Sequence, residues 1–256
     1  HGGRAADGTI SNADITVTSA NGGKVALQGT GIATTTGDAS RTYTQIGHGG
    51  HDADVQADSA ITVTGDGGVD ILGGGYQEGY AMVGHGGDSS DAQGTGFDGK
   101  VSVTATTGDL VLTSNLPGGS SGNRTFAKIG HGGYLSAAAD YSGSITATAS
   151  TGSILATAAR DGNNNYVQIG HGGVANNATT AHSGTINVSA ANNITFTGGL
   201  DNMGGAGNDR EFAMIGHGGA NTDGDHFGSI TVAAGTRGSG SVTFTAGDIR
   251  GASEGP

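Results

Sequence analysis

Apolar residues fall along this chain in short alternating runs, and these runs are bounded by Gly, Asn, Asp and Ser. Such a pattern is typical of β-strands separated by turns. Because successive side chains of a strand point to opposite faces, the apolar residues of each run can share one interior. The residues between them are mostly Thr, Ser, Asn or Asp, which suit a wet face. The pattern therefore predicts an all-β protein.

A longer repeat organises these runs. The tripeptide His-Gly-Gly recurs at separations of 37 to 47 residues, starting at His1, His48, His85, His131, His171 and His217. An aromatic residue lies five positions before the histidine in five of the copies: Tyr43, Tyr80, Phe126, Tyr166 and Phe212. Chance cannot place an octamer such as Tyr166-Val-Gln-Ile-Gly-His-Gly-Gly five times, so the chain is an array of one repeated unit.

Two further strands are expected after each His-Gly-Gly. The second strand carries apolar pairs such as Ile15/Val17 and Ile145/Ala147, and the third carries pairs such as Val25/Leu27 and Ile194/Phe196. Three strands per repeat, with variable loops, predict a parallel β-solenoid of about one repeat per coil, because stacked neighbours would form a continuous core. A propeller of six three-stranded blades is the rival, although blades usually carry four strands.

Residues 1–256 are expected to form a single repeat array, and the array is a fragment of a longer chain or a filament subunit, since His1 already lies inside a repeat. The 54 glycines raise the question of disorder, but the ordered alternation argues against it. The absence of cysteine excludes disulfides and thiolate metal sites.

Charge and hydropathy exclude two classes of partner. The formal net charge is −12, and the ten basic residues are spread singly, so nucleic acid is not an expected partner. Long apolar runs are absent, so membrane insertion is not expected either.

A resemblance to a known family indicates a function for the predicted fold. Phrases such as Gly99-Lys-Val-Ser-Val-Thr-Ala followed by Gly108-Asp-Leu-Val-Leu resemble the large secreted adhesins of the filamentous haemagglutinin type. The Ile-Gly-His-Gly-Gly element is similar to repeats in very long bacterial surface proteins. The resemblance implies a right-handed β-helix exported by two-partner secretion, an extracellular or cell-surface location and a structural or adhesive role. It brings no catalytic residues.

The histidines are expected to form a ladder, because residues that occur once per coil stack at about 4.8 Å. One interpretation makes His and its glycines a structural corner, in which His satisfies polar groups of the turn. The alternative is a row of imidazoles that binds Zn²⁺, Cu²⁺ or Ni²⁺. No second ligand type recurs at a fixed offset, which favours the structural interpretation.

The aromatic residues are expected to form a second ladder that faces outward, together with the residues two positions further on: Gln45, Met82, Lys128, Gln168 and Met214. Such a row either packs under the long preceding loop or offers a surface to cell-surface glycan or a neighbouring fibre. Cover by the loop is the favoured interpretation.

Calcium has two possible sites. The segment Gly65-Asp-Gly-Gly-Val-Asp-Ile-Leu-Gly resembles a calcium-binding nonapeptide, but it occurs once and aligns with the third strands. Loop carboxylates could also bind Ca²⁺: Asp52, Asp54, Asp88, Asp91, Asp223 and Asp225. They do not recur in the copies at His131 and His171, so no integral cofactor is expected.

Other functions find less support. The outward Thr row, for example Thr62/Thr64, suits ice binding, but Asn187/Ser189 and Thr231/Ala233 break it. The best carboxylate cluster, Asp223 and Asp225 beside His226, is no distinct catalytic constellation, so an enzyme is not expected. We therefore expect a structural or adhesive surface fibre whose partners are itself or further coils, end to end.

Overall fold

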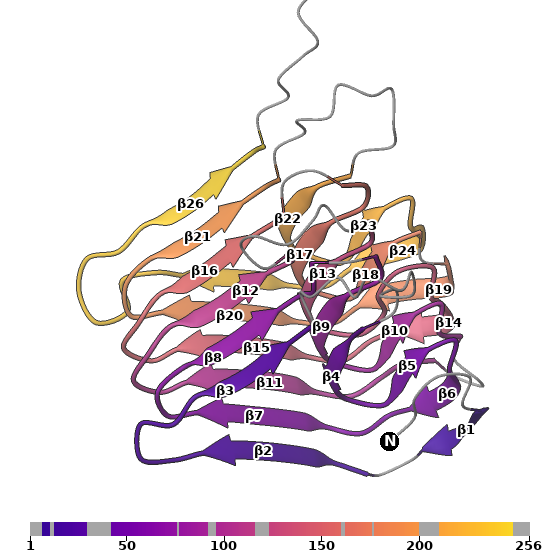
Figure 1. Ribbon diagram of the computed structural model, residues 1–256, viewed down its shortest axis with the longest axis horizontal. Coiled ribbons are helices and arrows are strands. Elements are labelled where there is room, and N and C mark those ends of the chain that lie inside the picture. The colour runs from indigo at the N-terminus through magenta and orange to yellow at the C-terminus, as the bar shows by residue number, and fades with distance from the viewer. Residues whose placement is uncertain are drawn as a thin grey trace, which may run out of the picture.

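The computed structural model describes residues 7–10, 13–29, 42–75, 77–91, 96–115, 123–159, 162–175, 177–199 and 210–247. All regular secondary structure in these ranges is β-strand. Every strand pairing among these residues is parallel and joins a strand to its equivalent in the next repeat. Figure 1 shows these strands side by side from the indigo first repeat to the yellow last one. The fold is thus all-β, with stacked parallel sheets consistent with a β-solenoid.

Three long sheets run through the stack. Sheet one contains the predicted second strands: β2 (Ile15–Ser19), β7 (Ile61–Gly65), β11 (Val101–Ala105), β15 (Ile145–Ala149), β20 (Ile186–Ala190) and β25 (Ile230–Ala233). Sheet two contains the predicted third strands: β3 (Val25–Gln28), β8 (Val69–Leu72), β12 (Leu110–Thr113), β16 (Ile154–Thr157), β21 (Ile194–Thr197) and β26 (Val242–Thr245). The aromatic sheet contains β4 (Thr44–Ile46), β9 (Tyr80–Val83), β13 (Phe126–Ile129), β17 (Tyr166–Ile169) and β22 (Phe212–Ile215).

Short strands that the pattern did not predict follow the histidines. The motif glycines form one set: β5 (Gly49–His51), β10 (Gly86–Asp88), β18 (Gly172–Val174) and β23 (Gly218–Ala220). The outer segments form the other: β1 (Asp7–Ile10), β6 (Asp54–Ala57), β14 (Ala137–Tyr141), β19 (Asn177–Ser183) and β24 (Asp223–Phe227). The count of three strands per repeat was therefore too low, because glycine strands carry no apolar alternation to reveal them.

The main core lies between sheet one, sheet two and the inner face of the aromatic sheet. Ile145 and Ile186 are fully buried and paired in register, as are Ile154 and Ile194. Ala127 and Ile129 of the aromatic sheet point into the same core. The predicted inward residues of all three strands are confirmed for these positions. A second core lies behind the aromatic sheet, and a third lies under the outer strands.

Candidate functional site

The histidines form a continuous ladder at one corner of the stack. Ring centroids are 4.8–5.1 Å apart and the rings are within 9° of parallel. The described members are His48, His85, His131, His171 and His217. The predicted vertical register is confirmed for these five, and His1 lies outside the described residues.

In His85, His131, His171 and His217, both ring nitrogens are engaged by backbone groups. The Nδ1 atom of His131 accepts the backbone N–H of His85 at 3.0 Å. Because Nδ1 is an acceptor, Nε2 carries the proton, and it donates to the carbonyl oxygen of Gly99 at 3.0 Å. The same pattern repeats at His85 and His171, where Nε2 meets the carbonyls of Ser59 and Gly143.

These hydrogen bonds use the ring nitrogens to stabilise the corner of the stack, which is a structural role. Burial lowers the pKa of His131 to about 4, and burial also holds the pKa values of His85 and His171 well below the ordinary range. The rings are therefore neutral near pH 7. Neither nitrogen of these three rings offers a lone pair to a metal ion without the loss of a hydrogen bond to the backbone. The geometry favours the structural interpretation over a metal-binding row.

The glycines beside the ladder have a steric role. Gly130 has a φ of 128°, which L side chains rarely adopt. A Cβ at Gly130 would also overlap the carbonyl oxygen of Gly170 in the next repeat. The residue that precedes each ladder histidine must therefore be glycine for the repeats to stack at this distance.

Of the residues expected to face outward beside the aromatics, Met82, Lys128 and Gln168 are buried instead, and Gln45 and Met214 are half-buried. Gln168 donates from Nε2 to the carbonyls of His171, Gly216 and Gly218 at 2.9–3.3 Å. Lys128 donates from Nζ to Gln168 Oε1 and to the carbonyl of Gly170, both at 2.6 Å. Burial holds the pKa of Lys128 well below its usual range. These side chains satisfy the carbonyl groups that the tight corner turns inward.

The aromatic ladder is present, and its central rings are covered, whereas the alternative of a surface open to ligands is wrong for them. Successive rings stack with centroids 4.5–5.0 Å apart: Tyr43, Tyr80, Phe126, Tyr166 and Phe212. Tyr80, Phe126 and Tyr166 are completely buried. Tyr134 and Val174, which follow the His-Gly-Gly motif, cover the row and build the second core with it. The segment after the histidine thus supplies cover, and no aromatic surface remains for glycan on these three rings. The expected cover by the preceding loops falls partly on residues outside the described ranges.

A second row of rings was missed in the sequence. Phe97, Tyr141, His182 and His226 follow one another under the outer strands, with centroids 5.9, 4.8 and 4.8 Å apart. Their distance from the preceding ladder histidine varies from copy to copy, but each ring lies four residues before the first residue of the following strand of sheet one, and this fixed offset could have revealed the row. His182 is buried, neither of its ring nitrogens has a hydrogen-bond partner, and burial lowers its pKa to about 3.

Near the N-terminal end of the described stack, a polar cluster interrupts the second core. The position three residues after each ladder histidine is occupied in turn by His51, Asp88, Tyr134, Val174 and Ala220. His51 Nε2 lies 3.4 Å from Glu78 Oε2 and 3.8 Å from Asp88 Oδ1, and all three side chains are buried. Arg124 Nη1 pairs with Glu78 Oε1 at 3.0 Å. Within the described ranges this is the one group of three residues with metal-ligand geometry.

The loop carboxylates considered for Ca²⁺ do not assemble into one site. Asp88 belongs to the polar cluster, and Asp52 lies at its edge, with Oδ2 2.9 Å from His51 Nδ1. Asp91 and Asp54 meet only where the backbone N–H of Asp91 approaches Asp54 Oδ1, at 3.4 Å. Asp223 and Asp225 are exposed on β24 beside the exposed His226. The segment 65–73 forms part of β7 and β8, as the alignment of third strands predicted.

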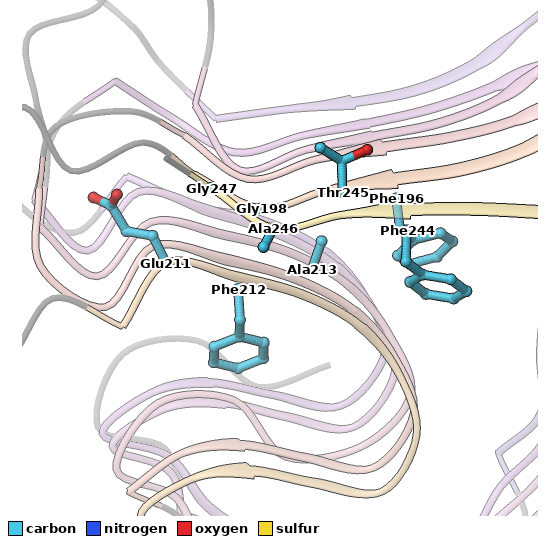
Figure 2. A pocket seen from close by; sticks show the side chains of 9 residues that line it. All are labelled: Phe196, Gly198, Glu211, Phe212, Ala213, Phe244, Thr245, Ala246 and Gly247. Carbon is cyan, nitrogen blue, oxygen red and sulfur yellow. The ribbon is translucent and has the colours of Figure 1, made fainter. Parts of the chain in front are cut away.

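The last described repeat leaves an apolar hollow. It lies between β21, β22 and β26 and is lined by Phe196, Gly198, Glu211, Phe212, Ala213, Phe244, Thr245, Ala246 and Gly247. Figure 2 shows the rings of Phe196 and Phe244 side by side, while Phe212 points away from them on the other face of its strand. The hollow thus belongs to the main core.

Comparison of the chain with family models, with curated proteins and with solved structures finds no match. No helix capable of spanning a membrane occurs in the described part of the chain. The function of the chain is therefore inferred from the contacts between its repeats.

Proposed function

We propose that this chain is a stretch of an extracellular β-solenoid, with about one repeat per coil, and that it forms part of a bacterial surface fibre or stalk. The proposed class is the structural and adhesive surface protein of the filamentous haemagglutinin type. The observation that carries the proposal is the continuity of the His48–His217 ladder, in which each ring is bonded to a neighbouring repeat. Such a column adds length without a change in cross-section.

The internal chemistry supports a structural role over a catalytic one. The histidines at the corner, the buried Lys128 and the aromatic rings are all used in contacts between repeats or in satisfaction of backbone carbonyls. Buried groups that are fully hydrogen-bonded specify one packing arrangement. We therefore assign the recurring geometry of the repeat to stacking and not to turnover of a substrate.

The last described strands support end-to-end continuation. Phe244 of β26 is 54% exposed, whereas Phe196, its paired residue in the preceding repeat, is completely buried. Ile230 and Val242 are 48% and 44% exposed, whereas their paired residues Ile186 and Ile194 are completely buried. The difference arises because a following repeat covers the earlier residues. We propose that a further coil of the same repeat covers this face, from the same polypeptide or a second copy.

Imaging of the native material tests the fibre assignment. Electron microscopy of the cell surface, with an antibody raised against this chain, should show label along thin fibres or stalks. Label on discrete particles that never extend would contradict the proposal.

Scattering of the purified chain across concentration tests the end contact separately. The proposal predicts particles that lengthen without a change in cross-section. A Phe244→Asp variant should remain short, because a carboxylate cannot be buried unpaired in the apolar interface. The matched variant Thr245→Asp, on the alternate position of the same strand, should still lengthen. Equal lengths for both variants and the parent chain would refute the contact through this core face.

A further inference from the structure

The polar cluster around His51 differs from the histidine ladder in what its nitrogens face. In the ladder, Nε2 points at a backbone carbonyl that accepts its proton. His51 Nε2 instead faces two carboxylate oxygens, those of Glu78 and Asp88, at 3.4 and 3.8 Å. On the other side of the ring, Asp52 Oδ2 lies 2.9 Å from Nδ1. A hydrogen bond from Nδ1–H to such a carboxylate commonly orients a metal-bound imidazole, and Asp52 is close enough to accept it once a metal ion holds the ring.

Two buried atoms at the cluster lack partners. Asp88 is 1% exposed, and its Oδ2 atom has no hydrogen bond. His51 is 3% exposed, and its Nδ1 atom makes no hydrogen bond either, although Asp52 Oδ2 lies 2.9 Å away. A buried polar atom that lacks a partner costs about 1–3 kcal/mol, so such atoms usually indicate an additional bound group.

The charges of the surrounding side chains indicate that the bound group is a cation. Three carboxylates, those of Asp52, Glu78 and Asp88, surround one imidazole, and the guanidinium of Arg124 neutralises one of them. Two negative charges are left when His51 is neutral. A divalent cation would balance them and would accept the lone pair of Nε2.

We propose that His51, Glu78 and Asp88 bind one divalent first-row cation of the Zn²⁺ type. Nitrogen and oxygen ligands lie about 2.0–2.2 Å from Zn²⁺, which places neighbouring ligand atoms about 3.3–3.6 Å apart. The separations from His51 Nε2 of 3.4 and 3.8 Å approach this geometry before any metal is bound. An imidazole in the set favours Zn²⁺ and similar metals over Ca²⁺ and Mg²⁺, which take oxygen ligands.

The cation would act as a clamp between repeats. His51 ends β5 and Asp88 ends β10, the paired strand of the next repeat. Glu78 belongs to the segment before β9, and its partner Arg124 precedes β13, one repeat further along. In later repeats, Tyr134, Val174 and Ala220 fill the same column with apolar contacts. The metal would thus replace hydrophobic packing where the second core becomes polar.

Metal stoichiometry tests the site. The 256-residue chain is stripped with a chelator, exposed to Zn²⁺ in competition with a chelator of intermediate affinity, and analysed by mass spectrometry of bound metal. We expect one Zn²⁺ per chain and a higher unfolding temperature with Zn²⁺ than with Ca²⁺. Co²⁺ in the same site should give a visible absorption band.

Variants locate the ion. Asp88→Asn and His51→Gln should abolish the bound equivalent, and Asp52→Ala should weaken binding by about 10–100-fold, the usual effect of a lost orienting group. The matched controls Asp225→Asn and His226→Gln change the same residue types on the exposed β24 and should retain one Zn²⁺. Circular dichroism shows whether each variant is folded, and Asp52→Ala keeps the test decisive if Asp88→Asn unfolds.

Three outcomes would overturn the proposal. If the parent chain binds no Zn²⁺, the cluster is an ion-pair network only. If the folded Asp88→Asn and His51→Gln variants retain the bound ion, or if Asp52→Ala binds as tightly as the parent chain, the ion lies elsewhere. If Ca²⁺ binds in preference to Zn²⁺, the assignment of metal class is wrong.

Discussion

The backbone N–H of His85 donates to Nδ1 of His131 over 3.0 Å, and the two imidazole rings stack 4.8 Å apart. One flat side chain thus joins consecutive repeats through a hydrogen bond and a ring contact. Its opposite nitrogen ties the corner to the strand of sheet one through the carbonyl of Gly99. Imidazole provides an acceptor and a donor on opposite edges of a small planar ring, which explains why histidine recurs at this corner.

Replacement of His131 by alanine should therefore destabilise the chain strongly. The change leaves the backbone N–H of His85 and the carbonyl of Gly99 buried without hydrogen-bond partners. Each such unsatisfied polar group lowers the free energy of unfolding by about 1–3 kcal/mol. With the cavity that remains, we expect a loss of about 3–6 kcal/mol in the free energy of unfolding. Urea unfolding monitored by circular dichroism measures it. The exposed His226 is the control, and His226→Ala should change stability by less than about 0.5 kcal/mol. Equal losses for the two variants would contradict the assigned role of the ladder.

The ladder should also make the fold sensitive to mild acid. Burial lowers the pKa of His131 to about 4, below its ordinary value of 6.5, so the unfolded chain takes up this proton first as the pH falls. The groups that face His131 are the neutral His85 and His171 rings and the buried Lys128, whose charge acts in the same direction. Stability is therefore complete above about pH 6.5 and falls progressively toward pH 4, by about 3 kcal/mol for His131 alone.

Urea midpoints measured at pH 7.0, 5.5 and 4.5 follow this loss. The ladder predicts a steady decrease, with a smaller decrease in His131→Gln, which has no imidazole to protonate at that position. A midpoint that stays constant over this interval would show that the rings are accessible to protons in the folded state.

Periodicity was sufficient to predict the strands of the three long sheets and the columns of histidine and aromatic rings. The pairs Ile15/Val17 and Val25/Leu27 recur with their neighbours, and they indicated the strands of sheets one and two at the observed positions. The once-per-repeat histidine implied vertical stacking, and rings at 4.8–5.1 Å confirm it. Because the strands of the three long sheets pair parallel and in register, residues at equivalent positions of the repeat stack in columns.

The burial of Tyr80, Phe126 and Tyr166 could not be read from the same pattern. The alternation of apolar residues along a strand shows which face lies on the main core, but it does not show whether the opposite face is covered. In this fold the segment after His-Gly-Gly covers that opposite face. The cluster of His51, Glu78 and Asp88 was hidden for the opposite reason. His51 and Asp88 occupy a column that is apolar in later repeats, and the position of Glu78 holds Arg124, Asn164 and Arg210 in the later copies, so no recurring ligand pattern marks the cluster.

The main core should tolerate truncation poorly. Ile145 is completely buried on β15 between Val101 and Ile186 of the neighbouring repeats, so Ile145→Ala should cost about 2–5 kcal/mol. The adjacent Thr146 lies on the opposite, partly exposed face of the strand, and Thr146→Ala should cost less than about 1 kcal/mol. Denaturant titration of both variants checks the assignment of faces. A near-neutral Ile145→Ala would place the core on the other side of sheet one.

The glycine before the ladder histidine should be the least replaceable residue of the corner. Gly130→Ala would place a methyl group against the carbonyl of Gly170, and would impose a φ of 128° on a residue with a Cβ. Because that obstacle is backbone, no side-chain movement relieves it, and we expect a loss of about 3 kcal/mol or more. Gly238→Ala is the control, since a Cβ there meets no atom within 4 Å. Hydrogen exchange on Gly130→Ala should show lost protection at β13 and β17, the strands on either side of the clash, while β7 remains protected. If the variant folds with the stability of the parent chain, the repeats do not approach as closely at this corner as the ladder requires.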